Sequence, residues 1–370
     1  MKHLLIHSDD FCLETGGIEN TSYLFAEYFS KYLSVYTLTP KDGHTPQCDN
    51  VTSYHGYVNH RSALFILDSI MNAIRIHKKH RLDYSLSVHF GYAVCCMILK
   101  LLYGVPYGVL AHGEEVIKWK RGGFISTLKY ILYYPVRYLT FRYADQIFTN
   151  TNYTKKLVEK LTSNPNIYVI NPPIGLMPDF NVGSSNKNHV LLSLGRLAER
   201  KGYHIIIKAL PQVMNKICDI RYIVAGSGEK EQYLKNLVNE LDLGNNVIFK
   251  GKVTEDEKKE LLSECGLFIM PSFEIPNVTV EGFGLSLLEA NSYGKFVVST
   301  WSGGIPEAVD NEKTGFLVKE NDVDELANAI LRFYDDNFNY NPAYCVEWAK
   351  RRHITEIVKQ YMNKINEVIK

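Results

Sequence analysis

Two glutamates, Glu281 and Glu289, flank a glycine-rich segment and are the residues best suited to bind or react with a ligand. Between them, Gly282 and Gly284 permit unusual backbone angles and a close approach of other groups. From Leu285 onward the apolar pattern is helical. The first amides of that helix have no partner within it and lie at the positive end of its dipole, which favours anions. The segment therefore predicts an anion site with a carboxylate on either side.

The separation of the two glutamates suits an extended ligand. The helical rise over eight residues is ~12 Å, which is the scale of a sugar, a diphosphate and a ribose laid end to end. The amides from Phe283 to Leu285 would then lie next to the anion. A solvated glutamate followed by one that the helix dipole stabilises would give the same spacing, and the spacing alone does not exclude that alternative.

A second cluster lies between Gly195 and Gly202, after an apolar run and before a helical pattern. It carries Arg196 and Lys201. Arginine offers a planar fork of donors and lysine a mobile point charge, so the two residues together could clamp a diphosphate. An ordinary basic surface loop is the alternative interpretation.

Two further glycine-containing loops follow predicted strands. The sequence Gly226-Ser227-Gly228-Glu229 is half of a dinucleotide fingerprint, but the third glycine of GxGxxG is missing. Gly228 is a candidate for close approach to a ligand, although close packing of two loops would explain it equally well. The segment Ser302–Glu307 either approaches a ligand or makes a tight turn.

The first half of the chain offers two candidates, Gly17 and His112. The Gly16-Gly17 pair lies between the first predicted strand and helix, where α/β domains hold ligands. His112 follows the predicted strand Gly108–Ala111 and precedes a glycine and two acids. A histidine at such a strand end is a candidate site residue, although a lone histidine is more often structural.

The elements that would position these residues form two similar series. Leu4–Ile6 and Val190–Leu194 are apolar runs, each followed by a glycine-bearing loop and a helical pattern, over about 18–32 and 202–213. Strand and helix patterns alternate after both, which is typical of doubly wound α/β domains with parallel sheets. The other predicted strands are Ser34–Thr39, Tyr84–His89, Gly108–Ala111, Gln146–Thr149, Tyr168–Ile170, Tyr222–Ala225, Val247–Lys250, Leu267–Met270 and Phe296–Ser299.

We therefore predict a first domain over residues 1–175 and a second over residues 187–345. The stretch from Asn171 to Asn188 is rich in proline, glycine, asparagine and serine, which indicates a linker. From Ile354 onward, apolar residues recur at spacings of three and four, so residues 346–370 should contain a capping helix. A chain of 370 residues is also too long for one comfortable hydrophobic core.

The bulk composition excludes several classes of protein. The net charge of +1 gives no support to nucleic-acid binding, which usually needs a basic surface. The seven cysteines include no CxxC pair, so a zinc or thioredoxin-like motif is not expected. The apolar run at the start is too short for a signal peptide. The most membrane-like stretch, Tyr92–Ala111, is interrupted by Lys100, Gly104 and Pro106 and is interpreted as a helix, a turn and a strand. We expect a cytoplasmic protein.

Taken together, these motifs resemble those of the family 4, or group 1, glycosyltransferases, which are retaining enzymes with the GT-B fold. The resemblance is specific in the second half of the chain and looser in the first. The residues that carry it are Glu281 and Glu289 with their Gly-Phe-Gly-Leu interior, Gly195-Arg196, Lys201-Gly202, Gly226–Glu229, Gly303–Glu307, and, in the first half, Gly16-Gly17, His112 and Ala144–Thr151.

The resemblance implies two Rossmann-like domains facing across a cleft, with the last helix crossing back to the first domain. It implies a nucleotide-diphosphate sugar as co-substrate, held mainly by the second domain, and an acceptor held by the first. The chain would then move a sugar to a hydroxyl of a glycan or lipid-linked saccharide, in the synthesis of a surface polysaccharide or glycoconjugate.

The resemblance also implies a role for each candidate residue. Glu281 and His112 would be the catalytic residues beside the transferred sugar. Neither a metal nor a cofactor is implied, because basic side chains and a helix start would stabilise the diphosphate as it leaves. Retention could follow from attack on the same face of the sugar or from a double displacement. The donor-binding residues would be Arg196 and Lys201 at the diphosphate, Glu289 at the ribose, and Gly17, Gly228, Phe283, Gly284 and Leu285 elsewhere.

Two features of this chain add hypotheses of their own. The segment Glu274–Val280 is long for the loop before Glu281, and we expect it to influence which sugar is used. The segment Lys118–Arg142 interleaves basic and aromatic residues, as interfacial surfaces do. Ordinary domain helices would give the same pattern, and peripheral contact with the cytoplasmic face of a membrane is therefore a hypothesis.

Three alternative functions fit part of the pattern. They are a UDP-N-acetylglucosamine 2-epimerase-like isomerase, a dinucleotide oxidoreductase and a non-catalytic nucleotide-sugar-binding protein. An oxidoreductase needs a complete GxGxxG, which neither opening loop provides. An epimer formed without an acceptor would identify the isomerase, and an activity assay would separate the binding protein from the enzymes.

Overall fold

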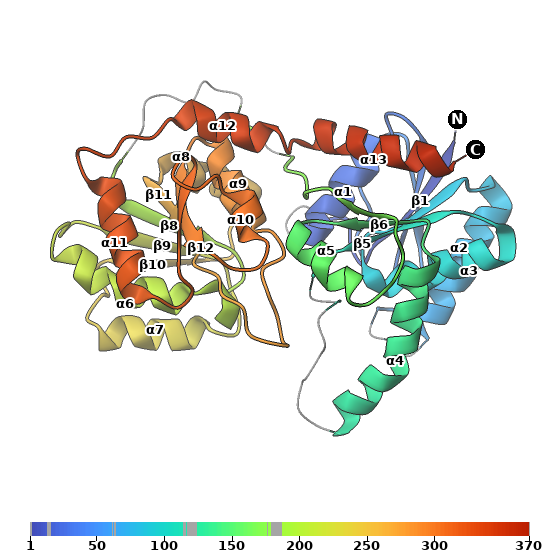
Figure 1. Cartoon of the computed structure of the whole chain (residues 1–370), viewed down its shortest axis with the longest axis horizontal. Coiled ribbons are helices and arrows are strands. Elements are labelled where there is room, and N and C mark those ends of the chain that lie inside the picture. The colour runs from blue at the N-terminus through green and yellow to red at the C-terminus, as the bar shows by residue number, and fades with distance from the viewer. Residues whose placement is uncertain are drawn as a thin grey trace. The chain divides into compact units, whose positions relative to one another are not determined.

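The computed structural model describes residues 2–12, 16–60, 62, 64–113, 116, 124–175, 177–178 and 187–369, without the side chains of 124–133. The chain divides into two compact units, of which the first comprises Met1–Gly175 and His353–Lys370 and the second Leu176–Arg352. Each unit is a parallel sheet covered by helices (Figure 1). The predicted α/β class, with two doubly wound parallel sheets, is confirmed.

Within the described residues, the first unit contains a sheet of seven parallel strands in the order β3-β2-β1-β4-β5-β6-β7. Strand β1 pairs with both β2 and β4, and its Leu4, Leu5 and Ile6 are fully buried, as expected of a strand covered on both faces. The strands are β1 (His3–His7), β2 (Ser34–Thr39), β3 (Val51–His55), β4 (Tyr84–Ser87), β5 (Tyr107–Ala111), β6 (Gln146–Thr149) and β7 (Ile167–Val169).

Alternate residues of β1 point to the two helical layers of the first unit. Leu4 and Ile6 pack with α1 (Gly17–Phe29) and α13 (Ile354–Val368) on one face. Leu5 packs on the other face with α2 and α3, as the two-residue repeat of a strand requires. That second layer consists of α2 (Phe65–His80), η1 (Phe90–Tyr92), α3 (Ala93–Tyr103), α4 (Phe124–Tyr143) and α5 (Asn152–Glu159).

The last helix of the chain belongs to the first unit. The buried residues of α13 recur at spacings of three and four, and the ring of Tyr361 lies 4.8 Å from that of Phe25 on α1. Helix α12 (Pro342–Lys350) belongs to the second unit, where Trp348 Nε1 donates to the carbonyl of Ala308 at 2.8 Å. The last boundary therefore falls between Arg352 and His353, later in the chain than the expected 345/346.

The described part of the second unit contains a six-stranded parallel sheet in the order β10-β9-β8-β11-β12-β13. Its strands are β8 (Val190–Leu194), β9 (Arg221–Ala225), β10 (Val247–Gly251), β11 (Leu267–Ile269), β12 (Phe296–Thr300) and β13 (Gly315–Val318). Its helices are η3 (Glu199–Lys201), α6 (Tyr203–Met214), α7 (Glu231–Glu240), α8 (Glu255–Glu264), α9 (Leu285–Ser292), α10 (Ile305–Ala308), α11 (Val323–Tyr334) and α12.

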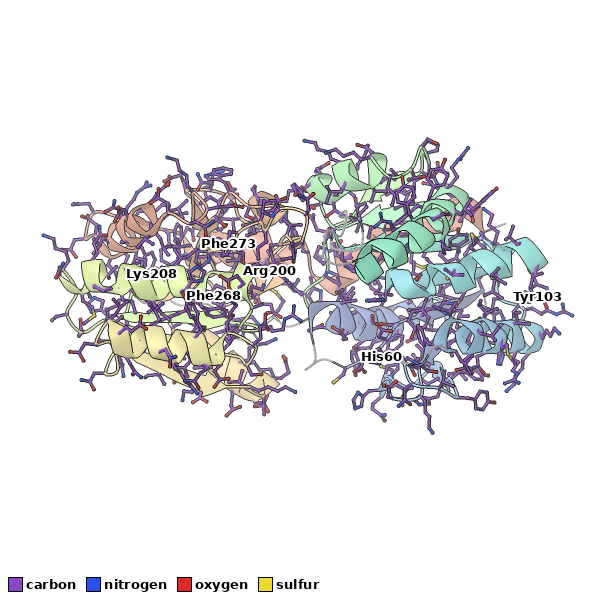
Figure 2. The ribbon with its side chains drawn as sticks, turned by 90° about the horizontal axis from the view of Figure 1, so that it is seen from below. His60, Tyr103, Arg200, Lys208, Phe268 and Phe273 are labelled. Carbon is purple, nitrogen blue, oxygen red and sulfur yellow. The ribbon has the colours of Figure 1, made fainter. Side chains whose placement is uncertain are left out.

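The main core of the second unit lies between its sheet and the layer formed by α6, α7 and α11. Phe268 of β11 lies inside the unit, whereas Lys208 of α6 is exposed (Figure 2). Strands β3 and β13 are not among the predicted strands. Both lie at sheet edges. Strand β3 is only partly buried along its length, and its polar residues interrupt the apolar run that marks a central parallel strand. Strand β13 does carry a buried apolar run, Phe316, Leu317 and Val318, so this criterion does not explain its absence from the predicted strands.

Candidate functional site

The strand order of the second unit reverses between β8 and β11, which pair side by side. The chain runs from β8 out to β10 and then returns to β11 on the other side of β8. At such a switch point the loops that follow the two strands diverge and leave room for a ligand. The loop after β8 carries Arg196 and η3, and the loop after β11 leads to Glu281.

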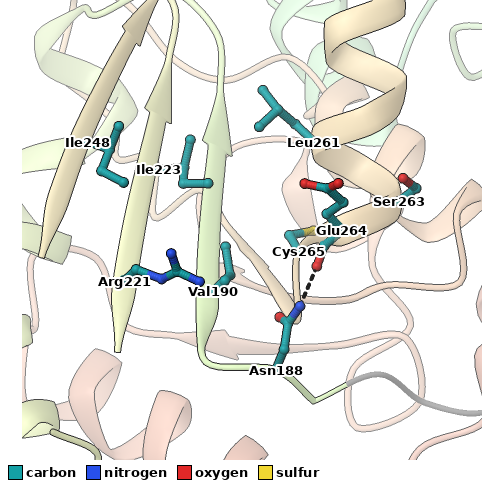
Figure 3. A pocket seen from close by; sticks show the side chains of 9 residues that line it. All are labelled: Asn188, Val190, Arg221, Ile223, Ile248, Leu261, Ser263, Glu264 and Cys265. Carbon is teal, nitrogen blue, oxygen red and sulfur yellow. Dashed lines mark hydrogen bonds between the residues drawn. The ribbon is translucent and has the colours of Figure 1, made fainter. Parts of the chain in front are cut away.

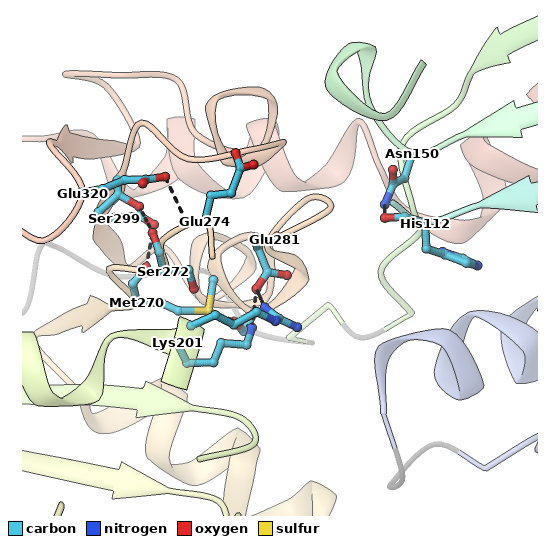
Figure 4. Close-up of polar contacts among 12 residues, drawn as sticks. His112, Asn150, Lys201, Met270, Ser272, Glu274, Glu281, Ser299 and Glu320 are labelled. Carbon is cyan, nitrogen blue, oxygen red and sulfur yellow. Dashed lines mark hydrogen bonds and ion pairs between the residues drawn. The ribbon is translucent and has the colours of Figure 1, made fainter. Parts of the chain in front are cut away.

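Glu281 is the centre of a charge cluster that these two loops form. Lys201 Nζ donates to Oε2 of Glu281 at 2.7 Å, and Arg200 Nη1 contacts the same oxygen (Figure 4). All three side chains are largely buried. Two cations thus contact one carboxylate in a partly desolvated place, where electrostatic interactions are stronger than in water.

The ionisation of Glu281 is set by its two partners. Burial by itself would raise the pKa of the Glu281 carboxyl, but the charges of Lys201 and Arg200 outweigh burial and lower the pKa to about 2. Glu281 is therefore ionised at neutral pH and holds no proton to donate as a general acid. It provides a fixed negative charge and an acceptor for hydroxyl groups.

The backbone around Glu281 is fixed by the predicted loop Gly303-Gly304. The amide of Gly304 donates to the carbonyl of Glu281 at 2.9 Å. Gly303 has a φ of 51°, and a Cβ at that position would lie 2.4 Å from the same carbonyl oxygen. The glycines of this loop therefore pack on the backbone of Glu281, and a side chain at Gly303 would displace it.

The loops after β8 and β9 pack backbone against backbone. Gly226 has a φ of 141°, and a Cβ there would lie 1.9 Å from the carbonyl oxygen of Gly195. Leu197 donates its amide to the carbonyl of Ser227 at 3.0 Å, and a Cβ at Gly228 would lie 2.6 Å from the carbonyl oxygen of Leu197. Gly228 thus helps to hold the loop that carries Arg196.

Helix α9 begins next to the charge cluster. It starts at Leu285, after Gly284 in the left-handed region with a φ of 93°, and Phe283 before it is buried. Ser286 Oγ and Lys201 Nζ both approach Sδ of Met270, at 3.1 and 3.4 Å. The amides of the first helical turn and the ammonium of Lys201 are therefore gathered in one place, which suits an anion.

Glu289 belongs to a different ion-pair group from Glu281. Lys258 of α8 donates to Oε1 of Glu289 at 3.1 Å and also pairs with Glu255 at 3.0 Å. Burial would lower the pKa of Lys258, but the two carboxylates outweigh it and raise that pKa. The two glutamates of the predicted pair are thus held by separate cations, and they do not share a proton.

Arg196 stays outside both groups. It is exposed, and its guanidinium makes no hydrogen bond or ion pair with the residues that the structure describes. Lys201, five residues later, is instead committed to Glu281. The predicted pair of phosphate-binding cations therefore consists of one exposed arginine and one lysine within a buried cluster.

The two candidates of the first half lie in the first unit. Gly17 is the first residue of α1. His112 follows β5, and its Nε2 donates to the carbonyl of Val88 at 2.8 Å, while Asn150 Nδ2 donates to the His112 carbonyl at 3.2 Å (Figure 4). Because a carbonyl only accepts, Nε2 is the donor in this contact. The acids that follow it in sequence, Glu114 and Glu115, lie outside the described residues.

The segment Glu274–Val280 forms a small turn closed by a bridge between Ile275 and Thr279. Ile275 donates its amide to the carbonyl of Thr279 at 3.0 Å, and Asn277 lies in the left-handed region with a φ of 60°. The amide of Glu274 donates to the carboxylate of Glu320 at 3.2 Å. The long loop before Glu281 is therefore an ordered hairpin-like turn rather than an extended connection.

Two residues of the site are absent from the predicted set, Arg200 and Lys258. Arg200 lies directly before Lys201 in the cluster between Gly195 and Gly202. Its position next to a predicted site residue is the signal that could have identified it. Lys258 comes from α8, which starts with the capping box Thr254/Glu257. Its pairing with Glu289 joins positions far apart in the sequence, and no local pattern indicates it.

A cavity of about 380 Å³ lies at the opposite end of the second sheet from these loops (Figure 3). It is lined by residues at the start of β8 and β9 and at the end of α8, among them Asn188, Arg221 and Glu264. None of the predicted site residues lines it. Ligands of open α/β sheets bind at the carboxyl ends of the strands, so the cavity is not a candidate for the same ligand.

Among the described residues, no group of three or more His, Cys, Asp and Glu side chains is placed to hold a metal ion. Of the helices that are described, none is both long enough and apolar enough to cross a membrane. In the segment Lys118–Arg142, residues 118–123 lie outside the described residues, and the rest belongs to α4.

Models of two protein families match this chain in succession. The model described as Glycosyltransferase Family 4 matches residues 15–176, and the one described as Glycosyl transferases group 1 matches residues 179–352. The first match falls on the first unit and the second on the second unit.

Curated relatives match part of the chain. An amylovoran biosynthesis glycosyltransferase, AmsK, from Erwinia amylovora is 30% identical over 181 residues, which are 48% of this chain and 44% of that protein. A GDP-mannose-dependent monoacylated alpha-(1-6)-phosphatidylinositol monomannoside mannosyltransferase from Corynebacterium glutamicum is 34% identical over 156 residues, 42% of this chain and 40% of that protein. The chain thus matches less than half the length of these relatives.

Solved structures match the whole chain. HepE from Anabaena, in complex with UDP and glucose, has a TM-score of 0.74 at 19% identity, covering 99% of this chain and 100% of its own. Sucrose-phosphate synthase from Thermosynechococcus elongatus has a TM-score of 0.78 at 18% identity, covering 100% of this chain and 99% of its own. At these identities the likeness concerns the fold.

Proposed function

This chain belongs to the family 4, or group 1, glycosyltransferases and has their GT-B type of fold, and from that premise we propose that it transfers a sugar with retention from a nucleotide-diphosphate sugar. The observation that carries the proposal is the cluster of Lys201, Arg200 and Glu281 beside the start of α9, at the switch point of the second sheet. It combines an anion site with an ionised carboxylate.

The diphosphate would bind between Arg196, Lys201 and the first amides of α9. Arg196 has no partner among the described residues, so it can fold onto a phosphate without breaking an existing contact. Negative charge accumulates on the diphosphate as the sugar departs, and preorganised donors stabilise it where it develops. Glu289, steadied by Lys258, would accept hydrogen bonds from the ribose hydroxyls.

The sugar would lie on the side of Glu281. An ionised carboxylate favours the positive charge that the sugar ring acquires as the bond to phosphate breaks, and it accepts hydrogen bonds from hydroxyl groups. His112, whose Nε2 donates to the carbonyl of Val88, would be the catalytic residue that the first unit contributes. We propose that the acceptor hydroxyl attacks the face that the leaving phosphate vacates, and that this phosphate takes the proton of the hydroxyl.

The reaction would need no divalent cation. Arg196, Lys201, Arg200 and the helix start together supply the positive charge that a metal ion would otherwise bring to the diphosphate. Transfer that persists in excess EDTA, with an α-linked product from an α-linked donor, is the expected result. Loss of activity in EDTA with recovery on adding Mg²⁺ or Mn²⁺ would contradict this part of the proposal.

The acceptor would be a hydroxyl of a glycan or lipid-linked saccharide, in the synthesis of a surface polysaccharide or glycoconjugate. The matched relatives support this choice, since one is named for amylovoran biosynthesis and another for a phosphatidylinositol mannoside acceptor. The reaction would take place in the cytoplasm, with peripheral contact to the membrane that carries the acceptor.

The direct test is a thermal-shift screen with UDP-, GDP-, ADP- and dTDP-sugars, followed by a transfer assay with the donor that binds. A ligand of the native state raises the unfolding midpoint. We expect one nucleotide to stand out and Arg196→Ala to abolish its shift. An epimerised sugar formed without an acceptor would instead identify an isomerase, and binding without any turnover would identify a binding protein.

A further inference from the structure

Helix α3 has an apolar surface that stays exposed among the described residues of its unit. Its sequence, from Ala93 to Tyr103, contains one charged residue, Lys100. A helix that is apolar on every side is normally buried on every side. In α3 the buried residues are on one side, and Leu101 and Leu102 are 64% and 59% exposed. The outward side of this helix is therefore aliphatic and faces solvent.

Helix α2 lies beside α3 and continues this surface (Figure 1). The two helices share an inward core against the sheet, to which α2 contributes Ala73 and Ile76 and α3 contributes Leu99. The ring of His77 on α2 lies 4.6 Å from that of Tyr103 on α3. Their outward sides therefore belong to one layer of the first unit.

The outward side of α2 carries an apolar stretch followed by a basic one. Leu67 and Met71 are 56% and 47% exposed, and Arg75 and Lys78 are exposed further along the helix. The spacings of four, four and three place these four side chains in one stripe. Tyr57 packs against it, with its ring 5.4 Å from the guanidinium of Arg75.

The charge of α2 and α3 departs from that of the whole chain. Residues 65–81 and 93–103, which contain these two helices, hold five basic residues and one acidic residue, Asp68. Their net charge is +4, in a chain whose total is +1. Four of the basic residues, Arg75, Lys78, Lys79 and Arg81, are exposed on α2 and directly after it, whereas Lys100 pairs with Asp145. A surface that is both aliphatic and basic fits a partner that is apolar inside and anionic outside.

We propose that the outer surface of α2 and α3, defined by Leu67, Met71, Arg75, Lys78, Leu101 and Leu102, docks on an anionic lipid bilayer. The leucines and the methionine would enter the headgroup region, while the basic side chains meet the lipid phosphates. A second copy of the chain does not fit, because a symmetric contact would bring two basic stripes together. This inference deepens the proposed function by giving the membrane contact a surface other than Lys118–Arg142.

The test is co-flotation of the full chain with lipid vesicles. We expect binding to equimolar phosphatidylcholine and phosphatidylglycerol, no binding to phosphatidylcholine alone, and release by high salt, because salt screens the attraction. Leu101→Ser/Leu102→Ser should lower the partition coefficient ~10-fold or more, since each leucine loses its apolar burial. Arg75→Glu/Lys78→Glu should abolish binding to the anionic vesicles.

A matched control is Lys208→Glu/Lys216→Glu, which reverses two exposed charges on and just after α6 of the second unit and should leave vesicle binding unchanged. The unfolding midpoint and the donor-induced thermal shift report the fold and the donor site separately, and every variant should retain them. The proposal would be overturned if the serine variant floated with anionic vesicles as well as the wild type does, or if the wild type did not float with them at all. So would a dimer in light scattering that the serine variant converts to a monomer.

Discussion

Lys201 and Glu281 form a hydrogen-bonded ion pair of 2.7 Å, which ties the loop after β8 to the loop after β11. Arg200 contacts the same carboxylate oxygen. The pair therefore has two consequences. It fixes the relative position of two loops at the switch point of the sheet, and it presents a positive group next to the start of α9.

The first prediction concerns acid stability. The charges of Lys201 and Arg200 lower the pKa of Glu281 from 4.5 to about 2. A lowered pKa stabilises the fold above the unfolded value, so this contribution is complete above about pH 4.5 and is lost as the pH falls toward 2. Its size is on the order of 3 kcal/mol. The difference in free energy of unfolding between wild type and Glu281→Gln should therefore be large at pH 7 and shrink in acid, as followed by urea denaturation.

Glu260→Gln is the control for that experiment, because Glu260 is an exposed glutamate of α8 outside the cluster. It should lie close to wild type at both pH values. A Glu281→Gln difference that is the same at pH 7 and pH 3 would show that the carboxylate acts through packing and not through its charge.

A second prediction concerns the phosphate-binding cations. Arg196→Ala and Lys201→Ala should each lower kcat by about 10²–10³-fold, because each removes a cation that stabilises the negative charge developing on the diphosphate. Arg196→Lys should recover only part of the loss, since lysine lacks the planar fork of donors. Lys208→Ala, on the exposed side of α6, is the control in a steady-state transfer assay. Wild-type rates for both alanine variants would remove these residues from the site.

The contact between Glu289 and Lys258 predicts that substitutions of these two residues have coupled effects on donor binding. We expect Glu289→Gln to raise the KM for the donor about 10-fold with a smaller change in kcat, because it would loosen the hold on the ribose. Lys258→Met should have a weaker effect in the same direction. In the double variant the two effects should not add, with a coupling of ~1 kcal/mol from a double-mutant cycle. Additive effects would mean that Lys258 does not orient Glu289.

Gly226 gives a prediction about the scaffold. In Gly226→Ala, the new Cβ would collide with the carbonyl of Gly195 in a backbone conformation that alanine rarely adopts. We expect a loss of about 2 kcal/mol or more in stability, together with weaker donor binding because the Arg196 loop would shift. Gly244→Ala is the matched control, since its Cβ would meet nothing within 4 Å. Equal unfolding midpoints for the two variants would contradict the packing argument.

The turn between Ile275 and Thr279 gives a prediction about donor choice. Deleting Pro276–Val278 should change the ratio of kcat/KM among donor sugars, because the turn directly precedes the sugar-side residue Glu281. Asn277→Gly preserves the left-handed conformation of the turn and should keep the wild-type ratio. A deletion variant with unchanged rate and unchanged donor preference would show that the length of this loop is irrelevant.

Much of the fold follows from local pattern. Central strands such as β1 and β8 are continuous apolar runs because both faces of a parallel sheet are covered, and each is followed by a glycine-bearing loop and a helix. The edge strand β3 does not meet that criterion, because it is only partly buried. Local pattern also does not predict the end of the second unit at Arg352. Helices α12 and α13 carry similar apolar patterns, and only their packing partners assign them to different units.

By itself, the sequence determined which residues could do chemistry. The types and order of Arg196, Lys201, Glu281 and Glu289, and the glycines around them, are local properties that survive in any unfolded chain. Only the tertiary structure decided which lysine pairs with which glutamate. Lys201 and Lys258 reach Glu281 and Glu289 across separations of 80 and 31 residues, and such pairings depend on strand order, which places loops side by side that no local pattern connects.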